Sequence, residues 1–214
     1  TPLHSIMGCS ELMENGLVKA GDMPRFVSRI HSEASRLVTL VDDIIGLSQL
    51  DENAEFPKED VDLLALAEEE VGALAATAKD KDIEISVGGE EITVTGVRRL
   101  LHEIVYNLCD NALRYTEAGG SVRVTVGKEE NEAVITVSDT GIGIPPEDLD
   151  RVFERFYRTD KSRSKETGGA GLGLSIVKHA VSYLGGRISL DSAQGIGTTF
   201  KVYLPKDPED HSDD

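Results

Sequence analysis

Apolar positions divide the chain into a helical first quarter and a longer part in which helices and strands alternate. From Pro24 to about Leu50, apolar residues recur at steps of three and four, which predicts a long helix with a heptad seam. The seam residues are Val27, Ile30, Ala34, Leu37, Val41 and Ile44. A shorter helix over 1–15 precedes this one, and the sequence GLVKAGDMP separates the two.

This helical hairpin presents a wider apolar stripe than its two helices can bury by themselves. Phe26, Leu40, Leu47 and Leu50 broaden the seam on the longer helix. We therefore expect a second copy of the chain to cover the stripe, so that two hairpins form a four-helix bundle. The alternative is that the stripe packs against the rest of the same chain.

The remainder of the chain predicts an α/β two-layer sandwich on a mixed sheet, because helical and strand patterns are interleaved. Helices are expected over about 62–79, 102–116 and 172–184, and strands over 84–87, 92–94, 121–127, 133–138, 187–192 and 198–204. The first two strands are expected to form a hairpin through a Gly88-Gly89 turn. The expected domains are residues 1–52 and 53–206, followed by an acidic, disordered tail over 207–214.

The helix predicted over 102–116 carries an unusual polar face. Its positions 103, 107, 111 and 115 are four residues apart and therefore share one side, while the apolar residues share another. The polar side holds Glu103, Asn107, Asn111 and Tyr115, with Arg114 beside them. Because Asn is a mediocre helix former, two carboxamides in register indicate that a polar ligand docks there. The alternative is an ordinary solvated face.

Two glycine-containing segments supply further candidate chemistry. Asp139 ends a predicted strand and is followed by Gly141 and Gly143, a pattern that suits recognition of an amino group on a flat ring. Further on, four glycines precede an amphipathic helix whose N-terminus would receive phosphate; they are Gly168, Gly169, Gly171 and Gly173. Neither G-x-G-x-x-G nor GK[ST] is present, which excludes Rossmann and P-loop sites.

The segment between these glycines is basic in a chain that is otherwise acidic. Residues 151–165 contain six basic and two acidic side chains, which suits a polyphosphate ligand. Residues 145–168 have few large apolar anchors, so we expect them to form a lid that is mobile until nucleotide binds.

Composition narrows the class of protein. The formal net charge of −17, from 22 basic and 39 acidic residues, argues against nucleic acid or an anionic membrane surface as partner. Cys9 and Cys109 have neither a disulfide framework nor zinc spacing, so a reducing compartment is favoured. No apolar run approaches the ~20 residues of a membrane span. The expected localisation is cytoplasmic, and a longer parent anchored in a bacterial inner membrane stays open.

These segments together resemble the catalytic domain of sensor histidine kinases, in the GHKL ATPase superfamily. The Asn box HEIVYNLCDNALRYT, the glycine box DTGIGIP, the F box FERFYR, the second glycine box GAGLGL and the closing GIGTTF occur in family order. The hairpin resembles the family's dimerisation and phosphoacceptor domain, and TPLHSIMGCSEL is similar to the pattern H-E-L-R-T-P-L-x-S-I-x-G. The resemblance implies a Bergerat-type ATP-binding fold with ATP and Mg²⁺ as cofactors.

The resemblance also implies a role for each matching residue. Asn111 would ligate Mg²⁺ through its carboxamide oxygen, with Glu103 and Asn107 alongside as metal-site and catalytic residues. Arg114 would reach a phosphate, and Tyr115 and Thr199 would lie near the adenine. Asp139 would accept the adenine amino group, and Gly141 and Gly143 would let the base approach. The residues that would serve the phosphates are Arg155, Arg158, Gly169, Gly171, Leu172 and Gly173.

The implied activity is ATP-dependent phosphorylation of a histidine in the dimer hairpin, followed by relay to an aspartate on a response-regulator receiver domain. In the family pattern the acceptor histidine lies four positions before Thr1, so His4 is not the acceptor and the chain is not expected to phosphorylate itself. Thr1 matches a position linked to dephosphorylation of the regulator.

Two other interpretations stay open. The first is another ATPase of the superfamily, such as a topoisomerase, mismatch-repair or chaperone ATPase or an anti-sigma kinase. The heptad hairpin and the FERFYR segment argue against it. The second is a non-catalytic dimeric module that docks a regulator and merely senses nucleotide. The intact Asn111, Asp139 and glycine boxes argue against that module, and a measurement of ATP binding would separate the two.

Overall fold

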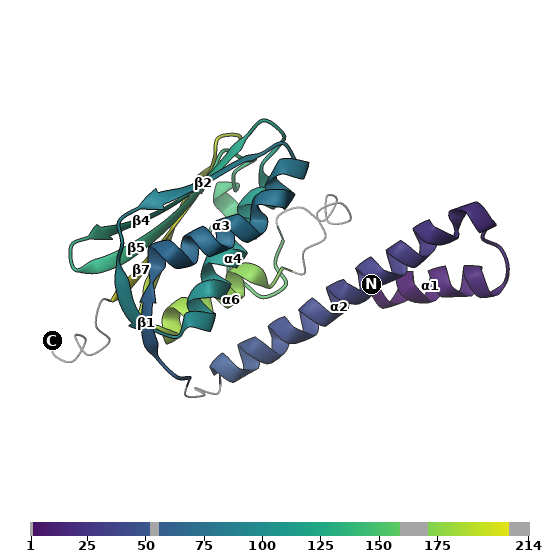
Figure 1. Ribbon diagram of the computed structural model, residues 1–214, viewed down its shortest axis with the longest axis horizontal. Coiled ribbons are helices and arrows are strands. Elements are labelled where there is room, and N and C mark those ends of the chain that lie inside the picture. Colours follow the sequence, from purple (N-terminus) through teal and green to yellow (C-terminus); the bar gives the residue numbers. More distant parts are fainter. Residues whose placement is uncertain (1, 52–55, 159–170, 206–214) are drawn as a thin grey trace. The chain divides into compact units, whose positions relative to one another are not determined.

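The computed structural model describes residues 2–51, 56–158 and 171–205 (Figure 1). The chain divides into two compact units, Thr1–Gln49 and Leu50–Asp214. The predicted acidic tail over 207–214 lies outside the described residues. Within the described part of the chain, no helix combines the length and the apolar character needed to cross a membrane.

The first unit is a helical hairpin, as the apolar pattern predicts. It consists of α1 (Pro2–Glu14), a short 3-10 turn η1 (Ala20–Asp22) and α2 (Met23–Asp51). The seam residues Val27 and Val41 leave 53% and 52% of their surface exposed. The large exposed apolar side chains of this unit are Leu3, Met7, Leu12, Leu17, Val27, Val38 and Val41. Among the described residues of the hairpin, part of the predicted stripe therefore stays exposed.

The second unit is built on a five-stranded sheet with the order β2-β4-β5-β7-β6. The strands are β2 (Glu84–Gly89), β4 (Ser121–Glu129), β5 (Glu132–Asp139), β6 (Arg187–Ala193) and β7 (Gly197–Pro205). The β2–β4 pair is parallel and the other pairs are antiparallel, so the sheet is mixed.

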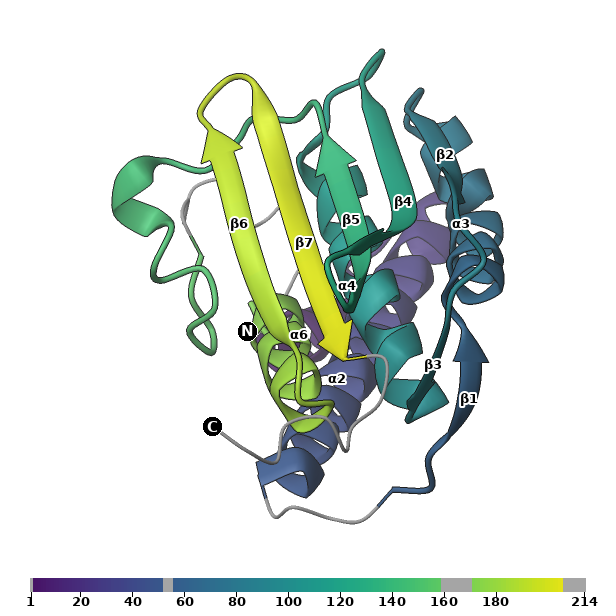
Figure 2. The same cartoon turned by 90° about the vertical axis from the view of Figure 1, so that its left-hand side faces the viewer.

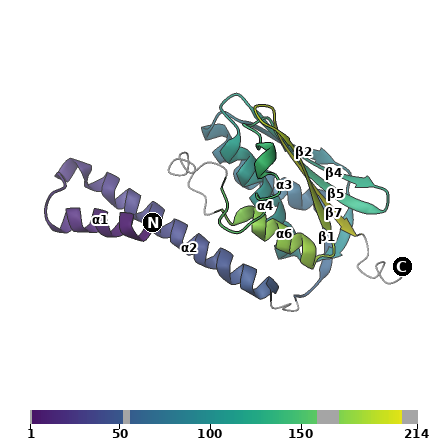
Figure 3. The same ribbon diagram turned by 180° about the vertical axis from the view of Figure 1, so that it is seen from behind.

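Among the described residues, helices α3 (Leu63–Asp80), α4 (Arg98–Tyr115) and α6 (Gly173–Tyr183) lie along one face of this sheet, which gives the two layers expected from the sequence (Figures 2 and 3). The side chain of Asp62 caps α3 by accepting hydrogen bonds from the Leu64 and Ala65 amides. The α/β two-layer prediction is confirmed.

One predicted connection is wrong, because strands 84–87 and 92–94 do not form a hairpin. β2 pairs with β4, whereas β3 (Thr93–Gly96) pairs antiparallel with β1 (Glu59–Asp62). No strand was predicted from the sequence at the position of β1. Gly89 has a φ of +133°, and a Cβ there would lie 1.9 Å from the Val126 carbonyl oxygen. The Gly-Gly pair therefore lets the chain follow β4 closely instead of reversing.

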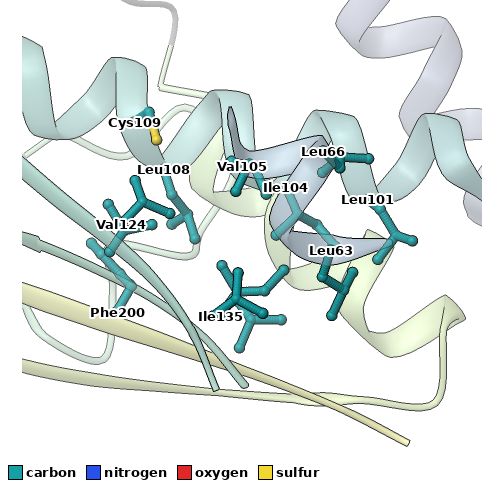
Figure 4. Close-up of a cluster of buried hydrophobic side chains, with 14 of the residues drawn as sticks. Leu63, Leu66, Leu101, Ile104, Val105, Leu108, Cys109, Val124, Ile135 and Phe200 are labelled. Carbon is teal, nitrogen blue, oxygen red and sulfur yellow. The ribbon is translucent and has the colours of Figure 1, made fainter. Parts of the chain in front are cut away.

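The core lies between the sheet and helices α3 and α4 (Figure 4). The apolar side of α4 is buried over its whole length, as its 3.6-residue period predicts. The labelled core side chains are Leu63, Leu66, Leu101, Ile104, Val105, Leu108, Cys109, Val124, Ile135 and Phe200. Burial raises the pKa of the Cys109 thiol to about 12, which makes it a packing residue and not a reactive thiol.

A buried carboxylate sits on the inward face of α3. Glu70 is only 2% exposed, and its Oε1 lies 2.6 Å from Nε2 of His102 on α4. Loss of hydration raises the pKa of Glu70, and the nearby His102 opposes this rise. Ionisation of Glu70 therefore lowers the stability of the fold in the pH range in which the carboxyl is charged.

We expect the Glu70→Gln variant to gain stability over the wild type as the pH rises. A carboxyl whose pKa is raised by folding stabilises the fold below its unfolded pKa, and that contribution is lost as pH rises through the folded pKa. Gln stays neutral throughout and still accepts a hydrogen bond from His102. Urea unfolding at pH 5 and pH 8 should show a gain in stability that is larger at pH 8, by about 1 kcal/mol.

The exposed neighbour Glu69, which pairs with Arg98 at 2.8 Å, provides the matched control. Glu69→Gln should change stability little at either pH, because exposed ion pairs contribute little. An equal effect of Glu70→Gln at both pH values would contradict this account of the buried carboxylate.

Candidate functional site

The polar face of α4 forms the floor of the candidate site. Glu103, Asn107 and Asn111 are half-buried there, beside the fully buried apolar stripe. The Asn107 Nδ2 group donates to the Glu103 carbonyl oxygen at 2.8 Å. This bond sets the direction of the carboxamide and leaves Asn107 Oδ1 as its acceptor atom.

The start of α6 lies directly against this face. A Cβ on Gly173 would lie 2.8 Å from Asn107 Oδ1 and 3.7 Å from Asn111 Nδ2, so only glycine fits without displacing the carboxamides. The preceding residue, Leu172, is buried. The structure thus brings the N-terminus of an eleven-residue helix to the two asparagines that the sequence singled out.

The C-terminal end of α4 joins the first glycine segment. The Tyr115 carbonyl oxygen accepts a hydrogen bond from the Ile142 amide at 3.0 Å, and a Cβ on Gly141 would lie 2.4 Å from the same oxygen. Arg114 lies one residue earlier and forms a 2.6 Å ion pair with Asp110. Glycine is therefore required at position 141 for the turn to close against the helix.

Asp139 is the most distinctive group of the site. It ends β5, and its Oδ1 accepts hydrogen bonds from the amides of Gly141 at 2.9 Å and Thr198 at 3.2 Å. Within the described residues, its Oδ2 accepts no hydrogen bond. Burial raises the pKa of Asp139, and the two amides oppose the rise. One carboxylate oxygen is thus fixed by the backbone, and the other is available to a donor on a ligand.

The loop after Asp139 packs on the turn between β6 and β7. Gly143 has a φ of +66°, and a Cβ there would lie 2.1 Å from the Ala193 carbonyl oxygen. Ser192, which sequence reasoning missed, accepts from the Ile144 amide at 2.9 Å and donates to the Gly197 carbonyl oxygen at 2.9 Å. No sequence pattern marks this serine, because these two partners are backbone groups 48 and 5 residues away. Its hydroxyl also lies 2.9 Å from the Thr198 hydroxyl.

Thr199, which the sequence predicts near the adenine, lies on the face of β7 that is opposite to Asp139. Side chains alternate along a strand, and Phe200 faces the core, so Thr199 points to the opposite face of the sheet. There its hydroxyl lies 3.0 Å from the Ser138 hydroxyl. Its neighbour Thr198 is buried, shares the face of Asp139 and donates its amide to that residue. Thr198 is the residue of the closing box that belongs to the site.

The basic segment is described up to residue 158. The Phe156 amide donates to the Gly171 carbonyl oxygen at 2.8 Å, so residues 156 and 171 meet beside the start of α6. Arg155 contacts His179 on α6, and Arg158 is half-buried. Two predicted site residues, Thr1 and Gly169, lie outside the described residues, as does the predicted lid beyond position 158.

These groups form a site with two chemically distinct ends. Asp139 offers a carboxylate oxygen at one end, and the Asn107–Asn111 face meets the first amides of α6 at the other. Among the described residues, no cluster of three or more His, Cys, Asp or Glu side chains is suited to a metal ion. A cation here would depend on carboxamide oxygens and on the oxygens of the ligand itself.

Comparison with known proteins agrees with this arrangement. Residues 96–208 match the domain family described as "Histidine kinase-, DNA gyrase B-, and HSP90-like ATPase". Residues 1–53 match the "His Kinase A (phospho-acceptor) domain". The chain therefore belongs to the histidine kinase-, gyrase B- and HSP90-like ATPase family, within which its hairpin makes it a sensor histidine kinase. The resemblance found in the sequence is confirmed.

Individual relatives are similar over nearly the whole chain. Sensor-like histidine kinase SenX3 of Mycolicibacterium smegmatis is 36% identical over 220 residues, which cover 99% of this chain and 57% of SenX3. Sensor histidine kinase WalK of Bacillus subtilis is 34% identical over 227 residues, which cover 100% of this chain and 36% of WalK. The chain thus spans about half the length, or less, of these curated relatives.

Solved structures share the fold. Histidine kinase AdeS of Acinetobacter baumannii has a TM-score of 0.80 at 22% identity, covering 96% of this chain and 95% of AdeS. Full-length ShkA, solved in complex with AMPPNP, has a TM-score of 0.76 at 29% identity, covering 95% of this chain and 43% of ShkA.

Proposed function

We propose that the chain is the ATP-binding and phosphotransfer core of a histidine kinase. The observation that carries this proposal is Asp139, with one oxygen fixed by the Gly141 and Thr198 amides and the other left for a ligand donor. Its carboxylate would accept the adenine amino group, and Gly141 would let the base approach. The complex of ShkA with AMPPNP supports nucleotide as the ligand.

The other end of the site would hold the phosphates and Mg²⁺. Asn111, with Glu103 and Asn107 alongside, provides oxygen ligands that suit this hard cation, which keeps several waters and binds substrate phosphates. The first amides of α6, from Gly173 onward, would receive phosphate oxygens, together with Arg114 and Arg158. Bound Mg²⁺ would neutralise charge on the phosphates, and the protein would mainly position them.

The phosphoryl group would pass to a histidine of the dimer hairpin and then to a response-regulator aspartate. The family pattern places the acceptor four positions before Thr1, outside these 214 residues. Thr1 itself would then lie one helical turn from the acceptor, where the family removes phosphate from its regulator.

We expect Asn111→Ala to weaken Mg²⁺-dependent ATP binding by tenfold or more. The substitution removes the proposed metal ligand, and hydrogen bonds or ligation involving charged groups contribute ~1.5–3 kcal/mol. Calorimetric titration with AMPPNP, with and without Mg²⁺, measures the effect. Asn131→Ala, in the exposed turn between β4 and β5, is the matched control and should bind like the wild type. Equal affinity of Asn111→Ala and wild type would remove Asn111 from the site.

We expect the chain to form a homodimer through the hairpin at tens of micromolar. The exposed seam residues Val27 and Val41 would be buried in the four-helix bundle, so Val27→Asp should yield monomers. Light scattering measures the mass, and Ser28→Asp, at an exposed position beside the seam, should remain dimeric. A monomeric wild type would contradict the seam as a dimer interface.

A further inference from the structure

His179 is not assigned to the nucleotide site, yet it links the basic segment to α6. Its Nε2 lies 3.3 Å from an Arg155 guanidinium nitrogen, and its Nδ1 lies 2.7 Å from the Ser175 carbonyl oxygen. A carbonyl oxygen only accepts and a guanidinium only donates. Nδ1 therefore donates to the Ser175 carbonyl oxygen, and Nε2 accepts from Arg155.

The segment that contains Arg155 is attached to its surroundings at several points. Before it, Phe153 packs edge-to-face on Phe200 at 6.3 Å between ring centroids. After it, Phe156 has a φ of +65°, which is unfavourable for a residue with a side chain, and its amide donates to Gly171. The hydrogen bond from Arg155 to His179 therefore lies next to a strained backbone position. Such a position persists only where the surrounding contacts hold it.

The position of His179 on the helix bears on the role of Arg155. His179 lies six residues after Gly173, which is about 9 Å along the axis at 1.5 Å per residue. The guanidinium of Arg155 is thus bonded well down α6 from the amides that would receive phosphate. This placement differs from the sequence prediction that Arg155 contacts a phosphate directly.

We propose that His179 is a positioning residue for nucleotide binding that acts through Arg155. The bond fixes residues 155–158 against α6 at a second point, beyond the Phe156–Gly171 junction. It thereby fixes the backbone position from which the side chain of Arg158, the nearest candidate phosphate ligand, extends. This inference rests on the proposed nucleotide site, and it assigns Arg155 to anchoring and leaves phosphate contact to Arg158.

The test is a double-mutant cycle read by AMPPNP affinity in calorimetry with Mg²⁺. His179→Leu, which removes the acceptor, should weaken binding about threefold to tenfold, the effect of one hydrogen bond. His179→Gln keeps an acceptor near the same place and should bind within about twofold of wild type. His179→Leu should add nothing in an Arg155→Leu background, because the two act through one bond. Ser182→Leu, at an exposed position on the same helix, is the control.

Three results would overturn the proposal: unchanged affinity in His179→Leu, a His179→Gln variant as weak as His179→Leu, or losses that multiply in the double variant. The last result would mean that Arg155 contacts the phosphate itself. If His179→Leu fails to fold, Arg155→Leu must show the threefold to tenfold loss and His179→Gln must not. A wild-type chain that binds no AMPPNP would instead refute the proposed function.

Discussion

Asp139→Asn should lose ATP binding by tenfold or more while the fold stays intact. The new carboxamide oxygen can still accept from the Gly141 and Thr198 amides, so the loop keeps both hydrogen bonds. The side-chain NH₂ then replaces the oxygen that faces the ligand, and two donors meet where the adenine amino group would lie. A hydrogen bond to a charged group contributes ~1.5–3 kcal/mol, which sets the expected loss.

Inosine triphosphate separates this explanation from general damage to the site. Its base carries a carbonyl oxygen in place of the amino group, so the carboxamide NH₂ of the Asp139→Asn variant would match it and the wild-type carboxylate would not. Calorimetry should therefore show that Asp139→Asn reverses the preference between the two nucleotides. An Asp139→Asn variant that prefers ATP as strongly as the wild type does would remove Asp139 from base recognition.

The second large effect concerns self-phosphorylation. We expect the 214-residue chain to bind ATP without incorporating γ-phosphate, because the family pattern would place the acceptor four positions before Thr1. His4 is exposed on α1, but it lies seven residues from the acceptor position, about 10 Å along a helix. Phosphoryl transfer loses efficiency with displacements of about 1 Å, so His4 should not substitute for the acceptor.

Joining the family sequence H-E-L-R before Thr1 should create acid-labile labelling from γ-labelled ATP. His4→Ala should leave that labelling unchanged, whereas replacing the added histidine should abolish it. Label on the 214-residue chain that disappears in His4→Ala would show that the acceptor lies after the Thr-Pro pair.

Local periodicity was sufficient to predict the helices and most strands. The buried stripe of α4 and the heptad seam of α2 each repeat within one element, so the sequence displays them directly. Pairing between β1 and β3 joins segments that are distant in the sequence through register, Glu59 with Gly96 and Asp62 with Thr93. No local pattern carries that information. The Gly88-Gly89 pair is typical of a hairpin turn, but the pairing of β2 with β4 takes precedence over this local preference.

The same limit applies to the site. Asp139 and Gly173 could be found in the sequence because each belongs to a local motif, DTGIGIP and GAGLGL. Thr198 and Thr199 are identical in type, and only the alternation of β7, anchored by buried Phe200, shows which one faces Asp139. Ser192, Glu70 and His179 act through partners distant in sequence, so their roles emerge only from the fold.

The most direct test of the account is calorimetric titration of the wild-type chain with AMPPNP in the presence and absence of Mg²⁺. The account predicts saturable binding of one nucleotide per chain, strengthened by Mg²⁺ and competed by ATP but much less by inosine triphosphate. A folded chain that shows no saturable binding of AMPPNP would contradict the proposed site. So would a chain that binds ATP and inosine triphosphate equally well.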